Sequence, residues 1–294
     1  MDKLTAAEAA ERAGVPVEQA RRIWRSLGFP DRSDDRAYDD ADVAALAALR
    51  GLVGEEPKDF EVALNVARGI GISLARLADW EVGALLQHGE SESGVVPEFA
   101  DRFESLLRYA WRRHFVVALD RMEALREIAD EPGTHHLTVG FADIVGFTAL
   151  SNEVSRERIG DIVETFETRC GDVIASRDGR LIKSIGDAVL FVNDDPMRAF
   201  ETAEGIINII GRDQRMPDVR VGLATGSVVL RMGDVFGPPV NLASRLTQVA
   251  RRNRIIVDHE TADSLPDDLV ESRPLPPRPV RGFGVVEPVA VRRP

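Results

Sequence analysis

Hydrophobic residues in the first 130 positions recur at intervals of three and four, the spacing of amphipathic helices. Thr5 and Glu8 have capping-box spacing, and Gly14 and Gly28 are expected to end helices. The longest uninterrupted pattern runs from Glu98 to about Ala129 and ends before Pro132-Gly133. The first half is therefore predicted to be all-α, with earlier helices over Thr5–Ala13, Pro16–Leu27, Asp39–Leu52 and within 57–90.

From Leu137 the pattern changes to the alternation and short apolar runs of strands. The order β-α-β-β-α-β, with additions, predicts a ferredoxin-like sheet with helices on one face, and so an α+β fold for this half. The expected elements are a strand at 137–142, a helix at 148–176, a hairpin at 180–192, a helix at 196–211, a strand at 218–224, a helix at 239–250, a strand at 254–258 and a strand pair within 280–292.

Charge and composition exclude several classes of protein. The 294 residues suggest two domains, and the net charge of −12 is uneven: residues 1–134 hold 17 basic and 26 acidic residues, and residues 135–294 hold 20 and 23. Neither half has the basic surface of a nucleic-acid-binding protein. The single cysteine, Cys170, excludes an internal disulfide and suits a reducing compartment. The sequence has no apolar run of membrane-spanning length and no signal peptide, so we expect a soluble, cytoplasmic protein.

The first 54 residues resemble the winged helix-turn-helix of MerR-type transcription regulators. Arg21, Arg22 and Arg25 are either a recognition-helix cluster or the solvated face of a helix that buries Ile23 and Leu27. The segment carries 8 basic and 10 acidic residues, which argues against binding to DNA.

A first motif, FADIVGFT, places Asp143 at the end of an apolar strand. A carboxylate there needs a partner, and a metal ion is one answer; a helix N-cap is the other. Gly146 is expected to turn the chain into a helix whose free amides, near Phe147 and Thr148, can hold a phosphate.

A second motif, LIKSIGDAVLF, reads as a hairpin containing Lys183 and Asp187. Lys183 is one of only three lysines in a chain rich in arginine, so an ammonium group is expected to matter there. The alternative is a turn with two solvated charges. Because the strands that carry them are neighbours in this topology, Asp143 and Asp187 are predicted to meet one pair of metal ions, as in phosphoryl transfer.

A third motif, GDVFGPPVNLASRL, contains Asp234, Asn241 and Arg245. The last two are four residues apart and share one face of a helix. They suit a ribose oxygen and a phosphoryl oxyanion, or they are an ordinary exposed polar pair.

With these three motifs, residues 137–292 resemble the catalytic domain of class III adenylate cyclases. The resemblance implies an ATP-dependent enzyme that needs two divalent cations, Mg²⁺ or Mn²⁺. It also implies roles for individual residues: metal binding by Asp143, Asp187 and the Ile144 carbonyl, adenine recognition by Lys183 and Asp234, transition-state contacts from Asn241 and Arg245, and a triphosphate contact from Arg281.

The resemblance further predicts a catalytic domain at 135–294 and a helical regulatory domain at 1–130, of the kind that precedes some actinobacterial soluble cyclases. It implies a head-to-tail homodimer in which metals come from one subunit and base-reading residues from the other. Lys183 and Asp187 are expected on opposite strands of the hairpin, which favours that division. The dimerisation arm before Asp234 is expected to be reduced, and the regulator of the helical domain is unknown.

The chemistry of the residues supports ATP independently. Lys183 donates and an ionised Asp234 accepts, which matches N1 and the 6-amino group of adenine and leaves guanine unsatisfied. Three other classes of protein are alternatives: a transcription regulator with a nucleotide-sensing domain, a diguanylate cyclase using GTP, and a catalytically silent ATP-binding module. A transcription regulator would need affinity for DNA. A diguanylate cyclase conflicts with the Lys183 and Asp234 pair, and a silent module would lack a metal-binding or transition-state residue, whereas this chain has them all.

Overall fold

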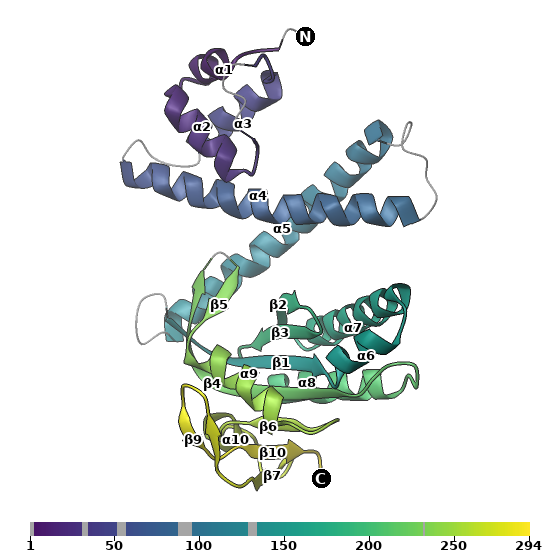
Figure 1. The fold of residues 1–294 in the computed structure, drawn as a ribbon. Coiled ribbons are helices and arrows are strands. Elements are labelled where there is room, and N and C mark those ends of the chain that lie inside the picture. The colour runs from purple at the N-terminus through teal and green to yellow at the C-terminus, as the bar shows by residue number, and fades with distance from the viewer. Residues whose placement is uncertain (1–2, 31–34, 52–56, 88–95, 129–133, 232) are drawn as a thin grey trace. The chain divides into compact units, whose positions relative to one another are not determined.

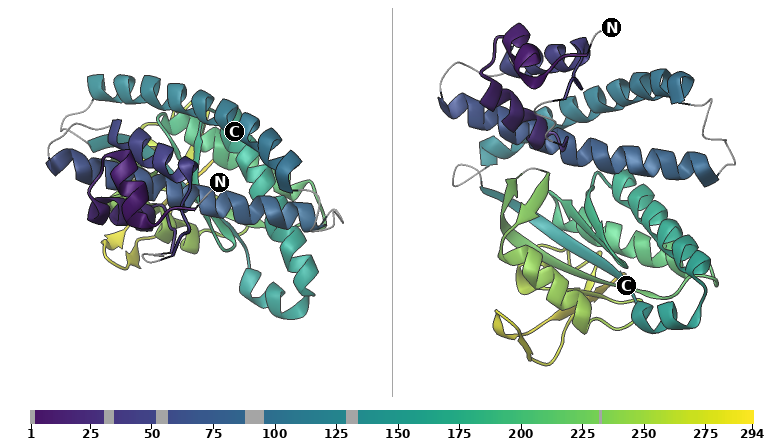
Figure 2. Two further views of the ribbon diagram at one scale, coloured as in Figure 1. Left: turned by 90° about the horizontal axis from the view of Figure 1, so that it is seen from above. Right: turned by 45° about the horizontal axis from the view of Figure 1, so that its top comes forward.

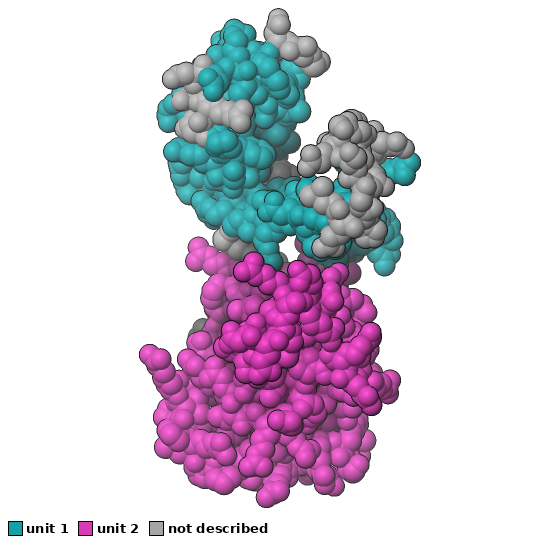
Figure 3. Space-filling view, turned by 45° about the vertical axis from the view of Figure 1, so that its right-hand side comes forward, with its two compact units in different colours: residues 1–116 teal, residues 117–294 magenta. Residues whose placement is uncertain are grey.

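The structure is a computed structural model that describes residues 3–30, 35–51, 57–87, 96–128, 134–231 and 233–294. The chain divides into two units, residues 1–116 and residues 117–294 (Figure 3). The predicted domain boundary between residues 130 and 135 falls mostly outside the described residues, as does the expected stop at Pro132-Gly133.

The first unit is all-α in its described residues, as the sequence predicts (Figure 1). Thr5 and Glu8 form the expected capping box, and Gly14 ends the first helix at φ 68°. Small alanines let the first three helices pack closely, and Trp24 stacks on Tyr38 with ring centroids 4.1 Å apart. The helices are α1 (Ala6–Ala13), α2 (Val17–Ser26), α3 (Asp40–Gly51), α4 (Pro57–Gln87) and α5 (Val96–Ile128), of which the last continues into the second unit.

Helices α4 and α5 expose large apolar side chains, including Trp80, Tyr109, Trp111 and Phe115. Where such side chains form a contiguous patch, that patch is typical of a surface that another protein covers.

The second unit is built on a mixed sheet in the order β2-β3-β1-β4-β6-β10-β7, with β5 paired to β4. The four strands β2-β3-β1-β4, with α7 and α8, form the predicted ferredoxin-like core. The strands are β1 (Thr134–Ile144), β2 (Arg180–Ile185), β3 (Ala188–Asn193), β4 (Val219–Arg231), β5 (Asp234–Phe236), β6 (Ile255–Val257), β7 (Glu271–Pro274), β8 (Arg278–Val280), β9 (Gly284–Val286) and β10 (Val289–Arg292).

Helices cover both faces of this sheet, so the expectation of helices on one face is wrong (Figure 2). One core packs Phe166 of α7 and Phe200 of α8 against the sheet, and the other packs Leu246 of α9 against the opposite face. Alternate residues of β1 enter the two cores, because successive side chains of a strand point to opposite faces. The helices of this unit are α6 (Phe147–Glu153), α7 (Arg156–Ser176), α8 (Pro196–Gly211), α9 (Pro238–Val249) and α10 (His259–Asp263).

Three elements differ from the sequence prediction. The helix expected at 148–176 is two helices, because Ser155 caps a new start with its hydroxyl. Strand β4 continues past residue 224 to Arg231 and pairs there with β5, which the sequence did not predict. The expected final strand pair is split, since β8 pairs with β9 while β10 joins the main sheet between β6 and β7. Among the described helices, none combines the length and the apolar character that crossing a membrane requires.

Candidate active site

Asp143 and Asp187 lie side by side at one end of the sheet. Asp143 is the penultimate residue of β1 and lies opposite Ala188 of β3 in the antiparallel register. The Ile144 amide donates to the Asp187 carbonyl at 3.1 Å. Asp187 itself lies in the turn Gly186-Asp187, and Gly186 adopts φ 64° there. The structure therefore brings the two carboxylates together as predicted, but Asp187 is not on a strand opposite Lys183.

The carboxylate of Asp143 is half-buried and paired with Arg220 of β4. Arg220 donates from Nε to Oδ2 of Asp143 at 2.7 Å, and its Nη2 lies 2.5 Å from the same oxygen in the ion pair. Burial raises the pKa of Asp143; the hydrogen bond and charge of Arg220 oppose this, and the charge of Asp187 adds to it. Asp143 is thus an ion-pair partner and not a helix N-cap, since Gly146 occupies the N-cap position of α6.

This carboxylate pair fits divalent cations that are shared with a substrate. Within the described residues, no three or more His, Cys, Asp or Glu side chains gather as a metal site of their own. Magnesium commonly binds through one or two carboxylates together with substrate phosphates, so Asp143, Asp187 and the Ile144 carbonyl are a sufficient protein contribution. Burial and the charge of Asp187 both disfavour the ionised form of Asp143, and a cation bound beside it would oppose both effects.

Arg220 is a site residue that the sequence analysis missed. It interrupts a run of buried apolar residues on β4, between Val219 and Val221. A charge inside such a run signals a partner. Only the pairing of β1 with β4, which sets Arg220 opposite Asp143, identifies that partner.

Lys183 and Asp234 form a direct ion pair, with Nζ and Oδ2 2.5 Å apart. Lys183 lies on β2 and Asp234 on β5, and both side chains are partly exposed. Burial acts to raise the pKa of Asp234, but hydrogen bonds from Lys183 and from the Val235 amide outweigh it and lower the pKa. The structure thus joins one donor and one ionised acceptor at the edge of the sheet.

Sheet register places Lys183 on the same face as Asp143. Lys183 is opposite Leu190 on β3, and Leu190 is opposite Phe141 on β1, two residues before Asp143. Directly paired residues point to the same face, as do residues two apart on one strand. This is the face that α9 covers.

Helix α9 carries Asn241 and Arg245. The helix approaches β4 closely at Gly222, where an added Cβ would lie 2.4 Å from the Thr247 amide nitrogen. Arg245 donates from Nη1 to Oε1 of Gln248 at 3.2 Å, and the Gln248 carbonyl accepts from Arg220 at 3.3 Å.

Asn241 is exposed, on the side of α9 away from its buried residues. No direct hydrogen bond or ion pair between described residues of one chain connects Asn241 or Arg245 to the two aspartates.

The other three residues predicted for the site lie at the start of α6 and in the turn between β8 and β9. Phe147 is half-buried at the start of α6, and Thr148 follows it exposed to solvent. Arg281 is exposed in the turn between β8 and β9. No described hydrogen bond or ion pair joins these three residues to the carboxylate pair or to the Lys183–Asp234 pair.

The structure thus combines a ferredoxin-like sheet, two neighbouring aspartates at one end of it, and a lysine–aspartate pair whose lysine lies on the same face as Asp143. The sequence profile of the adenylate and guanylate cyclase catalytic domain matches residues 130–290. An adenylate cyclase of Streptomyces coelicolor is 36% identical over 99% of this chain and 86% of its own length. An adenylate cyclase of Streptomyces griseus is 35% identical over 99% of this chain and 86% of its own.

Among solved structures, the catalytic core of a rhodopsin-guanylyl cyclase with converted specificity, in complex with ATPalphaS, is similar to this chain. The TM-score is 0.51 at 25% identity, covering 54% of this chain and 95% of that one. The chain belongs to the adenylate and guanylate cyclase family. The predictions of a class III cyclase, of an enzyme and of an α+β catalytic fold preceded by helices are therefore confirmed.

Proposed function

We propose that this enzyme converts ATP into 3′,5′-cyclic AMP and pyrophosphate. The observation that carries the proposal is the contact of Lys183 with Asp234. Adenine presents an acceptor at N1 and a donor at its 6-amino group. Lys183 can satisfy the acceptor, and Asp234, whose pKa is lowered, can satisfy the donor at neutral pH. Guanine reverses both groups and would leave this pair unsatisfied.

In the proposed reaction the ATP 3′-oxygen forms a bond to the α-phosphorus, and the bond from that phosphorus to the oxygen bridging to the β-phosphorus breaks. The hydroxyl proton passes to solvent, and pyrophosphate leaves. Asp143, Asp187 and the Ile144 carbonyl would hold two divalent cations, Mg²⁺ or Mn²⁺. When bound, such cations lower the pKa of the 3′-hydroxyl and neutralise charge on the triphosphate.

The protein's other groups would act on charge and orientation. The Arg245 guanidinium would stabilise the extra negative charge on the phosphoryl oxygens in the transition state. Asn241 would orient the ribose, and the amides at Phe147 and Thr148, together with Arg281, would donate hydrogen bonds to the triphosphate oxygens.

We further propose that the active enzyme is a homodimer with two shared sites. Asn241 is exposed on α9, and no direct contact ties it or Arg245 to the aspartates of its own chain. These residues are therefore available to a second copy. The exposed aromatic residues of α4 and α5 support the same assembly, because a second copy would remove them from water.

The helical half is proposed to regulate the catalytic half. The Streptomyces relatives match over essentially the entire chain, so the helices belong to the shared architecture. Membership of the cyclase family does not identify the regulator of the helical half. Deleting residues 1–131 should change the specific activity several-fold, whereas unchanged activity would contradict regulation.

The experiment that tests the proposed function is an assay of the purified protein with ATP and with GTP, in Mg²⁺ and in Mn²⁺. We expect cyclic AMP from ATP and far less cyclic GTP from GTP. The matched control is Arg245→Ala, which should lose activity by about a hundredfold or more while keeping the same melting temperature. A preference for GTP, or activity that survives in the control, would overturn the proposal.

A further inference from the structure

A recess of about 520 Å³ lies in the first unit between α2 and α4, far along the sequence from the catalytic residues. This volume is within the range of sites for small molecules. Arg22 and Ser26 line it from α2, and Leu64, Arg68 and Ile72 line it from α4. Arg22 and Ser26 are four residues apart, as are Leu64 and Arg68, so each set belongs to one helix face.

The recess exists because the end of α2 touches α4 at a glycine. A Cβ added to Gly71 would lie 2.4 Å from the Leu27 carbonyl oxygen, closer than any ordinary contact. This crossing fixes the two helices against each other, and the recess lies beside it.

The lining is basic in an acidic part of the protein. Residues 1–134 contain 17 basic and 26 acidic residues, yet the recess is lined by Arg22, Arg25 and Arg68 and by no described acidic residue. Arg22 donates to Glu61 at 2.8 Å, and Arg68 donates to Asn65 at 3.1 Å. A guanidinium group has five N–H donors, so each arginine keeps several for a ligand.

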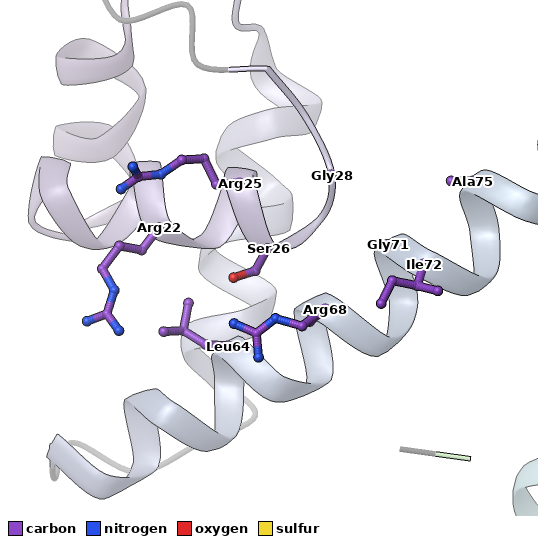
Figure 4. Close-up of a pocket in the computed structure, with 9 residues that line it drawn as sticks. All are labelled: Arg22, Arg25, Ser26, Gly28, Leu64, Arg68, Gly71, Ile72 and Ala75. Atoms are coloured by element: carbon purple, nitrogen blue, oxygen red, sulfur yellow. The ribbon is translucent and has the colours of Figure 1, made fainter. Parts of the chain in front are cut away.

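Side chains from both helices border the recess (Figure 4). The guanidinium group of Arg68 extends from α4 toward α2, and the hydroxyl of Ser26 points toward α4. Arg22 extends toward the earlier part of α4, on the other side of Leu64, while Arg25 points away from them. Two guanidinium groups and one hydroxyl therefore lie around the buried Leu64, and the exposed Ile72 supplies apolar lining.

We infer that this recess binds a small organic phosphate, a monoester with an apolar or planar body. The three terminal oxygens of a phosphate monoester can accept from Arg22, Arg68 and Ser26 together, whereas a carboxylate has two. The ester group then lies against Ile72, which is 55% exposed, where it removes apolar surface from water. The inference concerns binding and does not depend on the proposed reaction.

DNA is the less suitable anion. Arg22 and Arg25 would be recognition residues only if their face of α2 could enter a groove. Both side chains are exposed, but they line a recess whose other wall is α4, and residues 1–54 carry 8 basic and 10 acidic residues, a balance that disfavours DNA.

The test uses phenyl phosphate as the probe, titrated calorimetrically into the full-length protein in a chelator-containing buffer free of phosphate. We expect saturable binding of one molecule per chain, weakened about tenfold or more by Arg68→Gln. Arg76→Gln, an exposed arginine on the same helix outside the recess, and Arg245→Ala, in the catalytic unit, should leave the affinity unchanged. If Arg68→Gln does not fold, judged by circular dichroism, Ser26→Ala takes its place and should also weaken binding.

Several results would overturn the inference. They are the absence of saturable binding, equal affinity in the wild type and the folded recess variant, and an equal loss in Arg76→Gln. Loss of binding in Arg245→Ala alone would show that phenyl phosphate binds to the catalytic unit and not to the recess. Benzoate bound as tightly as phenyl phosphate would make the ligand a carboxylate. Salt-sensitive binding of a short DNA duplex, lost in Arg68→Gln, would make the surface a DNA contact.

Discussion

Lys183 and Asp234 are 51 residues apart in the sequence, yet Nζ of one lies 2.5 Å from Oδ2 of the other. The contact forms because β4 turns back through β5, whose first residue is Asp234, and β5 lies against β2. The pair combines a group that only donates with a group that only accepts, which is the requirement for reading one edge of a purine.

Reversing this pair should change the base that the enzyme prefers. In the double variant Lys183→Glu and Asp234→Cys, the carboxylate accepts from N1 and the 2-amino group of guanine, and the thiol donates to its O6. We expect kcat/KM for ATP to fall by about a hundredfold or more, with a much smaller loss for GTP. Steady-state assays with both nucleotides check this, and each single substitution serves as a control. An unchanged ATP preference in the double variant would mean that these residues do not read the base.

The same pair should contribute little to stability. Its side chains are 37% and 27% exposed, and ion pairs at such positions contribute about 1 kcal/mol or less. Lys183→Met should therefore change the free energy of unfolding by about 1 kcal/mol or less while abolishing most ATP turnover, as urea titrations and activity assays will measure. The matched control is Arg198→Met. It breaks the exposed ion pair between Arg198 of α8 and Asp178, and it should leave turnover unchanged.

The contribution of the Lys183–Asp234 ion pair to the free energy of unfolding has a predictable pH dependence. The folded-state pKa of Asp234 is lowered from 3.8, so its contribution is present above that value and is lost as the pH falls through the lowered pKa. The difference between wild type and Lys183→Met should be constant near neutral pH and shrink below pH 3.8. A difference that grows on acidification would contradict the assignment.

A mixed dimer should distinguish a shared site from a site within one chain. Asp143→Ala removes a proposed metal ligand and Arg245→Ala removes the arginine proposed to stabilise the transition state, so each homodimer should lose activity by about a hundredfold or more. If the two residues serve one site from different chains, both defects of a heterodimer fall in the same site. The other site is intact, and the heterodimer should recover about half of the wild-type activity.

The measurement requires co-expression with two different tags and purification of the doubly tagged dimer. Homodimers carried through the same purification are the controls. Activity in a proven heterodimer no higher than in either homodimer would mean that each chain builds its own site.

Two glycines of α4 should respond oppositely to a methyl group. A Cβ at Gly71 would collide with the Leu27 backbone, whereas nothing lies within 4 Å of a Cβ at Gly69. Gly71→Ala should destabilise the helical unit by about 1–3 kcal/mol. Gly69→Ala should be neutral or stabilising by up to about 1 kcal/mol, because glycine is unfavourable inside a helix. Thermal unfolding of both variants decides this, and equal effects would show that α2 does not press on α4 at Gly71.

Local patterns were sufficient for much of this protein. The apolar run before Asp143, the hairpin around Gly186 and the spacing of Asn241 and Arg245 each depend on residues close in sequence. The capping box of Thr5 and Glu8 forms as predicted for the same reason. Such features follow from backbone preference and side-chain periodicity, which a sequence displays directly.

The tertiary structure decided what depends on pairing between distant segments. The register of β1 with β4 gives Asp143 its partner Arg220, and the extension of β4 into β5 brings Asp234 to Lys183. The covering of the second sheet face by α9 likewise depends on Gly222, where the helix needs a residue without a side chain. Periodicity identifies which residues of a strand share a face, but register, strand order and helix position are set by the summed packing of elements far apart in the chain.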